Sequence, residues 1–252
     1  MSTVVLAISG SPRKQSFTEK MLDLVLQGMG AGLEVHKFHP YGMNIGPCNG
    51  CWSCWGRENP GECVQKDDFQ AILEVYKRAD YFLWAAPLYA FDFPAAVKGV
   101  LDRFFVVLEP PLRERADGLT DHPTRFDRHP QAVLISSCGF PEVENFEVLR
   151  RHFRIICEQM AWVWAGEVLI PASGIARAPK LFDGKYAQLR AAGEELLRAG
   201  ISPETTAAIA APVMPAEDYR RMATLSFTGG ALAKAEMAML ALKALGKRDT
   251  MG

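Results

Sequence analysis

Apolar residues along the chain fall into five short continuous runs, separated by longer segments with a helical pattern. Runs without polar alternation are typical of strands that are buried on both faces of a sheet. They occupy residues 3–9, 33–38, 81–87, 131–139 and 163–170. A helical pattern follows Gly10, and others occupy residues 68–78, 94–105 and 147–160. Strands that alternate with helices predict an α/β fold, a doubly wound parallel sheet with helices on both faces.

Two segments interrupt this alternation. Residues 109–130 are charged and rich in proline, and a connection of this length in a compact domain is usually functional or mobile. Beyond residue 171 the pattern is only helical, and we expect helices over residues 186–199, 203–211, 216–223 and 231–245. Ser202 is the expected N-cap of the second of these, with Pro203 at its first position. The sequence therefore predicts a domain over residues 1–171 and a helical C-terminal extension over residues 172–252, which packs or forms oligomers.

Charge is nearly balanced, with 28 Lys and Arg residues against 29 Asp and Glu residues. This balance predicts neither a nucleic-acid surface nor binding to an anionic membrane. The first residues contain no basic leader, and Lys234, Glu236 and Lys243 interrupt the last apolar helix, so we expect a cytoplasmic protein without a membrane span. Thiols stay reduced in that compartment, where clustered cysteines are more often metal ligands or redox groups than disulfides.

The turn after the first predicted strand has the composition of a phosphate site. Residues 9–21 read SGSPRKQSFTEKM, which contains neither the G-x-G-x-x-G of dinucleotide-binding folds nor the G-K-[ST] of nucleoside-triphosphate loops. Ser16 and Glu19 form a capping box, and the helix N-terminus that it marks offers free N–H groups to an anion. Several hydroxyls with Arg13 beside them suit one terminal phosphate. The alternative is a serine-rich cap exposed to water, but ligands commonly bind at the carboxyl ends of such strands.

Two further loops, after the third and fourth predicted strands, carry apolar and aromatic residues. They contain Pro87, Leu88, Tyr89 and Phe91, and Cys138, Gly139 and Phe140. A flat hydrophobic ring needs rigid apolar edges, an aromatic neighbour and backbone amides for its heteroatoms, and these loops provide them. Tyr89 and Phe91 follow the strand rather than lie within it, which disfavours a role in closing the core. A phosphate site at the first strand with an aromatic slot at the third and fourth predicts flavin mononucleotide (FMN) in a flavodoxin-like fold.

Four stretches carry a family resemblance: GSPRKQSFTEKML, CNGCWSC…CVQKDDF, AAPLY and AAVKGVLDRF. In this order they resemble the NADPH-dependent FMN reductase and iron–sulfur flavoprotein branch of the flavodoxin-like superfamily, over roughly the first two-thirds of the chain. The resemblance implies a five-stranded parallel sheet of order 2-1-3-4-5. It also implies that FMN is bound by Ser11, Arg13, Ser16, Phe17, Thr18, Pro87, Leu88, Tyr89, Ala90, Cys138 and Gly139.

Four of the six cysteines lie within sixteen residues, at Cys48, Cys51, Cys54 and Cys63. Three thiols at three-residue intervals can surround one corner of a cubane, in which each thiolate binds a different iron. Structural zinc sites more often use two separate C-x2-C knuckles. The iron–sulfur flavoproteins have a shorter final spacing, whereas here eight residues precede Cys63, with Pro60 and Gly61 among them to fold the chain back. A [4Fe–4S] cluster, a zinc site and a loop of free thiols remain as alternatives.

These features favour an FMN-dependent oxidoreductase that uses NAD(P)H to reduce a quinone, a flavin or another electron-poor small-molecule acceptor. The flavin supplies the chemistry, so we nominate no catalytic side chain. One alternative is a non-catalytic iron–sulfur flavoprotein that passes electrons between protein partners. Another is a scaffold that has lost its cofactor, which the retained Ser11, Arg13 and Ser16 disfavour. The segment 109–130 and the apolar helix over residues 231–245 have no evident role within one sheet, and they predict a homodimer or homotetramer.

Overall fold

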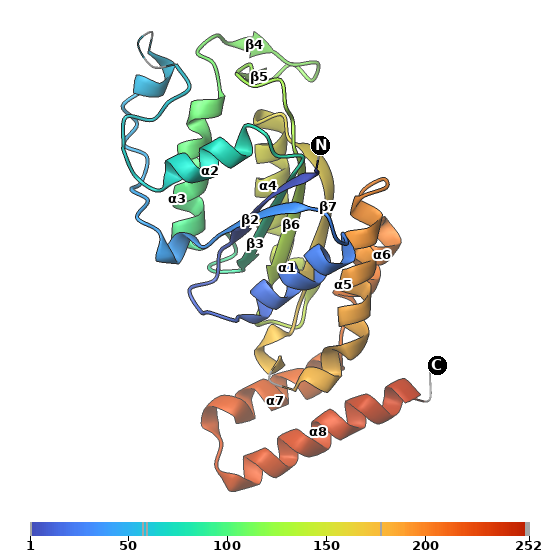
Figure 1. The fold of residues 1–252 in the computed structure, drawn as a ribbon. Coiled ribbons are helices and arrows are strands. Elements are labelled where there is room, and N and C mark those ends of the chain that lie inside the picture. Colours follow the sequence, from blue (N-terminus) through green and yellow to red (C-terminus); the bar gives the residue numbers. More distant parts are fainter. Residues whose placement is uncertain (1, 57, 59, 177, 250–252) are drawn as a thin grey trace.

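The computed structural model describes residues 2–56, 58, 60–176 and 178–249 (Figure 1). At its centre is a parallel sheet with the strand order β2-β1-β3-β6-β7. Its strands are β1 Val4–Ser9, β2 Glu34–Phe38, β3 Tyr81–Pro87, β6 Gln131–Ser137 and β7 Val163–Ile170. These are the five apolar runs of the sequence, so the predicted flavodoxin-like sheet of order 2-1-3-4-5 is confirmed.

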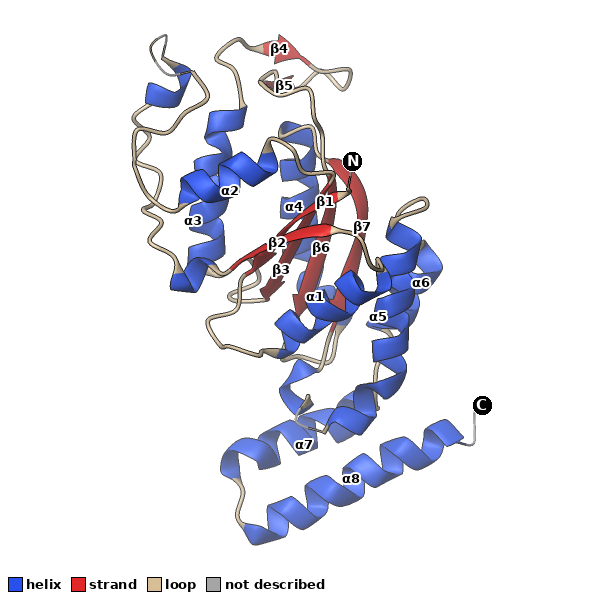
Figure 2. Ribbon diagram, viewed as in Figure 1, coloured by secondary structure: helices blue, strands red, loops and turns tan. Residues whose placement is uncertain are grey.

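Helices cover both faces of the sheet (Figure 2). One layer contains α1 Phe17–Gly28 and α5 Asp183–Leu196, and the other contains α2 Phe69–Tyr76, α3 Ala95–Arg103 and α4 Glu147–Gln159. Alternate residues of one strand serve the two layers. In β1, Leu6 and Ile8 pack with the second layer, whereas Val5 and Ala7 pack with the first. Both sets are buried, which explains why the strands show no polar alternation.

Short elements complete the connections between strands and helices. The 3-10 turns are η1 Pro40–Gly42, η2 Ser53–Trp55, η3 Phe104–Val107, η4 Val143–Phe146, η5 Ser173–Ile175 and η6 Pro179–Phe182. Within residues 109–130, β4 Arg113–Glu114 and β5 Thr120–Asp121 pair as a small antiparallel hairpin. The sequence predicts one long loop here, because strands of two residues are too short to show a periodic pattern. Arg113 Nε donates to Asp121 Oδ1 across the hairpin at 2.6 Å.

The part of the C-terminal extension around α6 covers the β7 edge of the sheet. Ser202 Oγ accepts from Thr205 N–H at 3.2 Å, which confirms Ser202 as the N-cap of α6 Pro203–Ala210. On the outer side of β7, Ile201 N–H donates to Ala165 O at 2.8 Å. Thr206 Oγ1 donates to Glu167 O at 3.2 Å. These bonds occupy carbonyl groups of an edge strand that would otherwise be open to pairing with another chain.

The last two helices, α7 Ala216–Thr228 and α8 Ala231–Asp249, lie side by side beyond the carboxyl edge of the sheet (Figure 1). Several of their large apolar side chains are exposed, namely Phe227, Leu232, Met239 and Leu242. Across the part of the chain that the structure describes, no helix has the length and apolarity needed to cross a membrane. The division of the chain at residue 171 stays a prediction, since α5 and α6 pack on the sheet whereas α7 and α8 pack mainly on each other.

Two glycines allow α1 and α5 to approach each other closely. A Cβ atom on Gly28 would lie 1.9 Å from Arg190 O, and one on Gly193 would lie 2.1 Å from Val25 O. Both distances are far below van der Waals contact, and the opposing atoms belong to the backbone, which cannot rotate away. The packing of this helical layer therefore requires glycine at both positions.

We expect the substitution Gly193→Ala to destabilise the fold by about 1–3 kcal/mol, because the new methyl group forces α1 and α5 apart. Gly184→Ala on the same helix is the matched control, since nothing lies within 4 Å of the added Cβ. Its helix propensity should make it neutral or stabilising by up to about 1 kcal/mol. Equilibrium unfolding in urea measures both, and equal midpoints for the two variants would contradict the close crossing.

Candidate functional site

The turn between β1 and α1 begins at the carboxyl edge of the sheet, where Gly10 packs against the central strand β3. Gly10 N–H donates to Ala85 O of β3 at 2.7 Å. A Cβ atom on Gly10 would lie 2.3 Å from Val97 Cγ2, so a larger residue does not fit between β3 and α3. Ser11 follows in a half-buried position and Arg13 is exposed. The turn therefore leads its polar residues out at the edge where β1 and β3 end.

Ser16 caps α1, as the sequence predicts. Its Oγ accepts from Glu19 N–H at 3.1 Å, and the Glu19 carboxylate accepts from Gln15 N–H at 3.0 Å. The second bond reaches one residue further back than in a standard capping box. In an α-helix the first N–H groups, here those of Phe17 and Thr18, have no partner inside the helix. With the positive end of the helix dipole, they make this turn suitable for an anion.

Thr18 joins the first turn to the end of β6. Its Oγ1 lies 2.7 Å from Ser137 Oγ, and both side chains are buried. One hydroxyl donates to the other, which leaves the second hydroxyl proton of the pair to donate elsewhere. Ser137 O also accepts from Leu88 N–H at 2.9 Å. The first turn of α1, the end of β6 and the loop after β3 are therefore linked by direct hydrogen bonds.

The loop after β3 is a tight turn that presents two aromatic rings. Tyr89 and Asp92 exchange backbone hydrogen bonds of 3.0 Å in both directions. The two residues between them, Ala90 and Phe91, have φ values of 48° and 64°. Residues other than glycine adopt such positive φ values only at a cost in free energy. Asp92 Oδ1 lies 2.7 Å from His152 Nδ1 of α4, and this contact fixes the turn against the helix layer.

The loop after β6 is held by the C-terminal extension. The carbonyl oxygen of Cys138 accepts from Ser173 N–H and Ser173 Oγ–H, both at 2.8 Å. The Tyr219 hydroxyl of α7 donates to Gly139 O. Burial raises the pKa of the Cys138 thiol, which favours its protonated form. The sequence does not point to Tyr219, because 80 positions separate it from Gly139 and no motif marks it.

Three large aromatic side chains remain uncovered where these loops meet. Tyr89 is 41% exposed, Phe91 49% and Phe140 58%. Pro87 closes β3 inside the core, whereas Leu88 is half-buried and Ala90 is exposed. The edge thus combines a helix N-terminus, an exposed guanidinium and uncovered rings, which is an arrangement that can bind a flat aromatic ligand with an anionic end.

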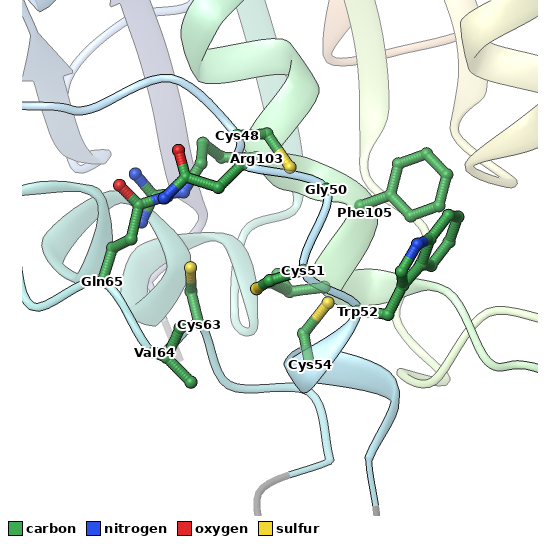
Figure 3. Close-up of a pocket in the computed structure, with 12 residues that line it drawn as sticks. Cys48, Gly50, Cys51, Trp52, Cys54, Cys63, Val64, Gln65, Arg103 and Phe105 are labelled. Atoms are coloured by element: carbon green, nitrogen blue, oxygen red, sulfur yellow. The ribbon is translucent and has the colours of Figure 1, made fainter.

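The four clustered cysteines line one pocket on another part of the molecule (Figure 3). Figure 3 shows Cys48, Cys51, Cys54 and Cys63 around a common space that Arg103 and Phe105 also border. All four thiols are free, with Cys48 and Cys51 exposed. Gly61 N–H donates to Cys54 O at 2.8 Å, so the segment before Cys63 does fold back and bring the fourth thiol to the pocket.

The thiols of this pocket differ in environment. Hydrogen bonds from Ser53 hold the pKa of Cys51 below its usual value. Burial, and then the neighbouring Cys63, raise the pKa of Cys54. Within the described residues, no three His, Cys, Asp or Glu side chains are grouped closely enough to hold one metal ion. The cysteines therefore surround the pocket instead of converging on a single point.

Hydrogen bonds join the two ends of the cysteine segment, residues 44–68, and we call these joined ends its neck. Asn44 and Asp68 exchange bonds, with Asn44 N–H donating to Asp68 Oδ2 at 2.7 Å and Asp68 N–H donating to Asn44 O at 3.0 Å. Gly46 N–H donates to Asp67 Oδ2 at 2.9 Å. Asp67 and Asp68 directly precede α2, where an aspartate ordinarily caps the helix. Asp67 does accept from Phe69 N–H at 3.2 Å, but Asp68, at the cap position, makes no capping bond with its side chain and serves the neck.

The cysteine pocket and the aromatic loops lie at opposite ends of α3. The helix follows the Tyr89–Asp92 turn, with Pro94 at its N-cap, and it ends at Arg103, which lines the cysteine pocket. With a rise of 1.5 Å per residue, its length separates the two regions by about 12 Å along the axis. The cysteines therefore do not lie beside the aromatic loops of the same chain.

Residues 3–155, more than half of the chain, match the protein family described as "NADPH-dependent FMN reductase". The chain belongs to this family. The match spans β1 to α4, so it includes all three loops at the carboxyl edge and the whole cysteine segment.

Individual relatives match a shorter segment of the chain. An "Iron-sulfur flavoprotein" of Archaeoglobus fulgidus is 36% identical over 99 residues, covering 39% of this chain and 44% of the relative. A protein of the same name from Methanosarcina thermophila is 33% identical over 100 residues, covering 39% and 51%. An "FMN-dependent NADH:quinone oxidoreductase" of Exiguobacterium is 27% identical over 112 residues. The chain thus spans about half the length of the two iron–sulfur relatives.

Solved structures agree on the fold. An NAD(P)H:quinone oxidoreductase from Methanothermobacter marburgensis superposes with a TM-score of 0.59 at 19% identity, covering 79% of this chain and 98% of that one. An FMN-dependent NADH-azoreductase from Bacillus anthracis, solved in complex with FMN, gives 0.58 at 14% identity, covering 77% and 99%. At these identities the likeness concerns the arrangement of the backbone.

Proposed function

We propose that the protein is an FMN-dependent oxidoreductase that uses NAD(P)H to reduce a quinone, a flavin or another electron-poor small molecule. The observation that carries this proposal is the carboxyl edge of the sheet, where the capped N-terminus of α1 and Arg13 stand near exposed aromatic rings. A ligand with a phosphate at one end and a flat ring at the other suits this edge. Membership of the FMN reductase family supports the same ligand.

In this proposal, the protein binds and orients the flavin. The phosphate would be held by Ser11, Arg13, Ser16, Phe17 and Thr18, through hydroxyls, the guanidinium and free N–H groups. The ring would be bordered by Pro87, Leu88, Tyr89, Ala90, Cys138 and Gly139. When bound, FMN supplies the electron transfer between the nicotinamide and the acceptor. We assign no proton transfer to a side chain, and the buried Cys138 thiol serves as a packing group.

We further propose that Cys48, Cys51, Cys54 and Cys63 hold a [4Fe–4S] cluster. Four free thiols around one pocket fit a cubane, since each thiolate binds a different iron. A zinc ion would need its thiolate ligands within about 2.3 Å of one point, and no group of three such side chains is close enough for that among the described residues. The names of the relatives from Archaeoglobus and Methanosarcina support the cluster.

One observation favours a second candidate function, an electron carrier that exchanges electrons with protein partners. The cysteine pocket opens near exposed apolar surface that includes Trp52 and Val64, at the far end of α3 from the aromatic loops. A cluster there would be accessible to another protein. Kinetics with small acceptors distinguish this function from a reductase.

We also propose that the chain forms a homodimer or homotetramer and works in the cytoplasm. The exposed apolar residues of α7 and α8, Phe227, Leu232, Met239 and Leu242, support self-association, since a large apolar patch usually marks an interface. All six cysteines are free, which is the usual state in a reducing compartment.

The proposed function predicts that purified protein contains or takes up FMN and oxidises NAD(P)H with a quinone, flavin or ferric acceptor. Nicotinamide and acceptor would use the same exposed face of the ring in turn, because the chain has no separate dinucleotide fingerprint. Steady-state kinetics should therefore be ping-pong, with parallel double-reciprocal lines. Protein that binds FMN but turns over none of these acceptors would leave the carrier as the better account.

Substituting Arg13→Ala should weaken FMN binding by about 1.5–3 kcal/mol, the range for a hydrogen bond to a charged group. Riboflavin lacks the phosphate, so its affinity should be lower in the wild type and unchanged by the substitution. Calorimetry with both flavins on both proteins measures the four affinities. Equal affinities of the wild type for FMN and riboflavin would refute the phosphate site.

Substituting Tyr219→Phe should weaken FMN binding roughly two- to tenfold, since one net hydrogen bond that fixes the loop after β6 is lost. Tyr81→Phe is the matched control: its hydroxyl also donates to a carbonyl, Leu196 O at 3.1 Å, but at the first residue of β3, the end of the strand away from that edge. The control should lower stability without changing FMN affinity. If both variants bind FMN as the wild type does, α7 has no role in the site.

A further inference from the structure

Arg103 places a buried positive charge beside the four cysteines. It is the last residue of α3, only 1% exposed, and it lines the cysteine pocket. Its Nη1 donates to Asp67 Oδ2 at 2.7 Å and to Gly46 O at 2.8 Å, and its Nη2 donates to Asp67 Oδ1 at 3.1 Å. Its Nε is buried, and among the described residues it has no hydrogen-bond partner. The guanidinium thus fixes the neck of the cysteine segment, and its buried Nε–H stays without a partner among the described residues.

The charge on this guanidinium is secured by its surroundings. Burial opposes the charged form, but the hydrogen bonds and charge of Asp67, together with the proximity of Cys63, outweigh it, so the pKa of Arg103 is raised. A buried cation with a free donor is costly unless a negative group lies near it. Asp67 is the one carboxylate within ion-pair distance of Arg103 in the described part of the chain. The cysteines are the other groups at the pocket that can carry negative charge, and binding a cluster would fix them there as thiolates.

We propose that Arg103 raises the reduction potential of the cluster held by the four cysteines, and that Asp67 positions Arg103 and partly offsets its charge. This inference rests on the cluster in the proposed function. Reduction moves one electron from the reductant, dithionite in a titration, which is thereby oxidised, to a cluster and its thiolates, which already carry a net negative charge. A nearby cation favours the more negative state, and hydrogen bonds to sulfur act in the same direction.

The two residues of the pair should shift the potential in opposite directions. Arg103→Gln removes the cation and leaves Asp67, so the potential should fall. Asp67→Asn removes the anion and keeps Arg103, so the potential should rise. Arg103→Lys keeps the charge but lacks the planar set of donors, so it should lower the reduction potential less than Arg103→Gln does. Lys98→Gln and Asp102→Asn are the matched controls, because this pair lies exposed on the same helix, where water screens both charges, and should leave the potential unchanged.

The experiment is an anaerobic redox titration of the full chain, followed by visible absorbance and electron paramagnetic resonance, after iron and acid-labile sulfide have been measured. About four irons per chain are expected in the wild type. The FMN content of each variant reports whether it has folded, because FMN would bind at the aromatic loops, at the other end of α3 from these substitutions. A purely structural role predicts that Arg103→Gln and Asp67→Asn lose iron in parallel, with the remaining cluster at the wild-type potential, and this result would overturn the inference.

The outcomes separate this inference from the proposed function. Wild-type protein that binds FMN but takes up no iron after anaerobic reconstitution would refute the cluster, and the role of Arg103 with it. Wild-type protein with a cluster, whose potential moves in the same direction or not at all in the two variants, would refute the role of Arg103 alone. Opposite shifts at unchanged iron content would support both.

Discussion

The parallel register of β1, β3 and β6 is the constraint on which the rest of the structure depends. Ser9 pairs with Ala85, Ala85 with Ile135, and Pro87 with Ser137, so the three strands end at the same edge. Backbone hydrogen bonds cannot slip by one residue without turning every buried side chain to the wrong face. The loops that follow these strands are therefore brought together by the sheet, whatever their own sequences. Contacts such as that between Thr18 and Ser137 stabilise an arrangement that the sheet already imposes.

The sheet and the helix caps could be predicted because their signals are local and physical. A run such as VVLAIS has no polar face to present to water, which leaves a doubly covered strand as the consistent structure. Ser16 and Ser202 lie directly before helices and their hydroxyls accept from N–H groups three residues later, as capping chemistry requires. Each of these predictions uses residues only a few positions apart, and the structure confirms them.

Other features could not be predicted because they join distant residues without a motif. Tyr219 reaches Gly139 from a helix that the sequence marks only as an extension. The LDRF stretch shows a helical pattern, and nothing in it indicates that Arg103 turns inward to meet Asp67, 36 residues earlier. Capping is the usual role of an aspartate directly before a helix, but the neck of the cysteine segment uses the carboxylates of Asp67 and Asp68 for longer-range bonds. Tertiary contacts decide the role of a polar side chain wherever several donors compete for it.

A single helix relates the two candidate sites to each other. The turn that carries Tyr89 leads directly into α3, and the same helix ends at the guanidinium beside the cysteines. Between these ends the core is filled by aromatic rings: Phe93 packs on Trp84 at 5.9 Å between centroids, and Trp84 on Phe104 at 6.0 Å. Interiors packed in this way deform little. Arg103 and the aromatic loops are thus held at a fixed separation, so a change of charge at one end can alter the cysteine pocket while the geometry at the carboxyl edge of the sheet is preserved.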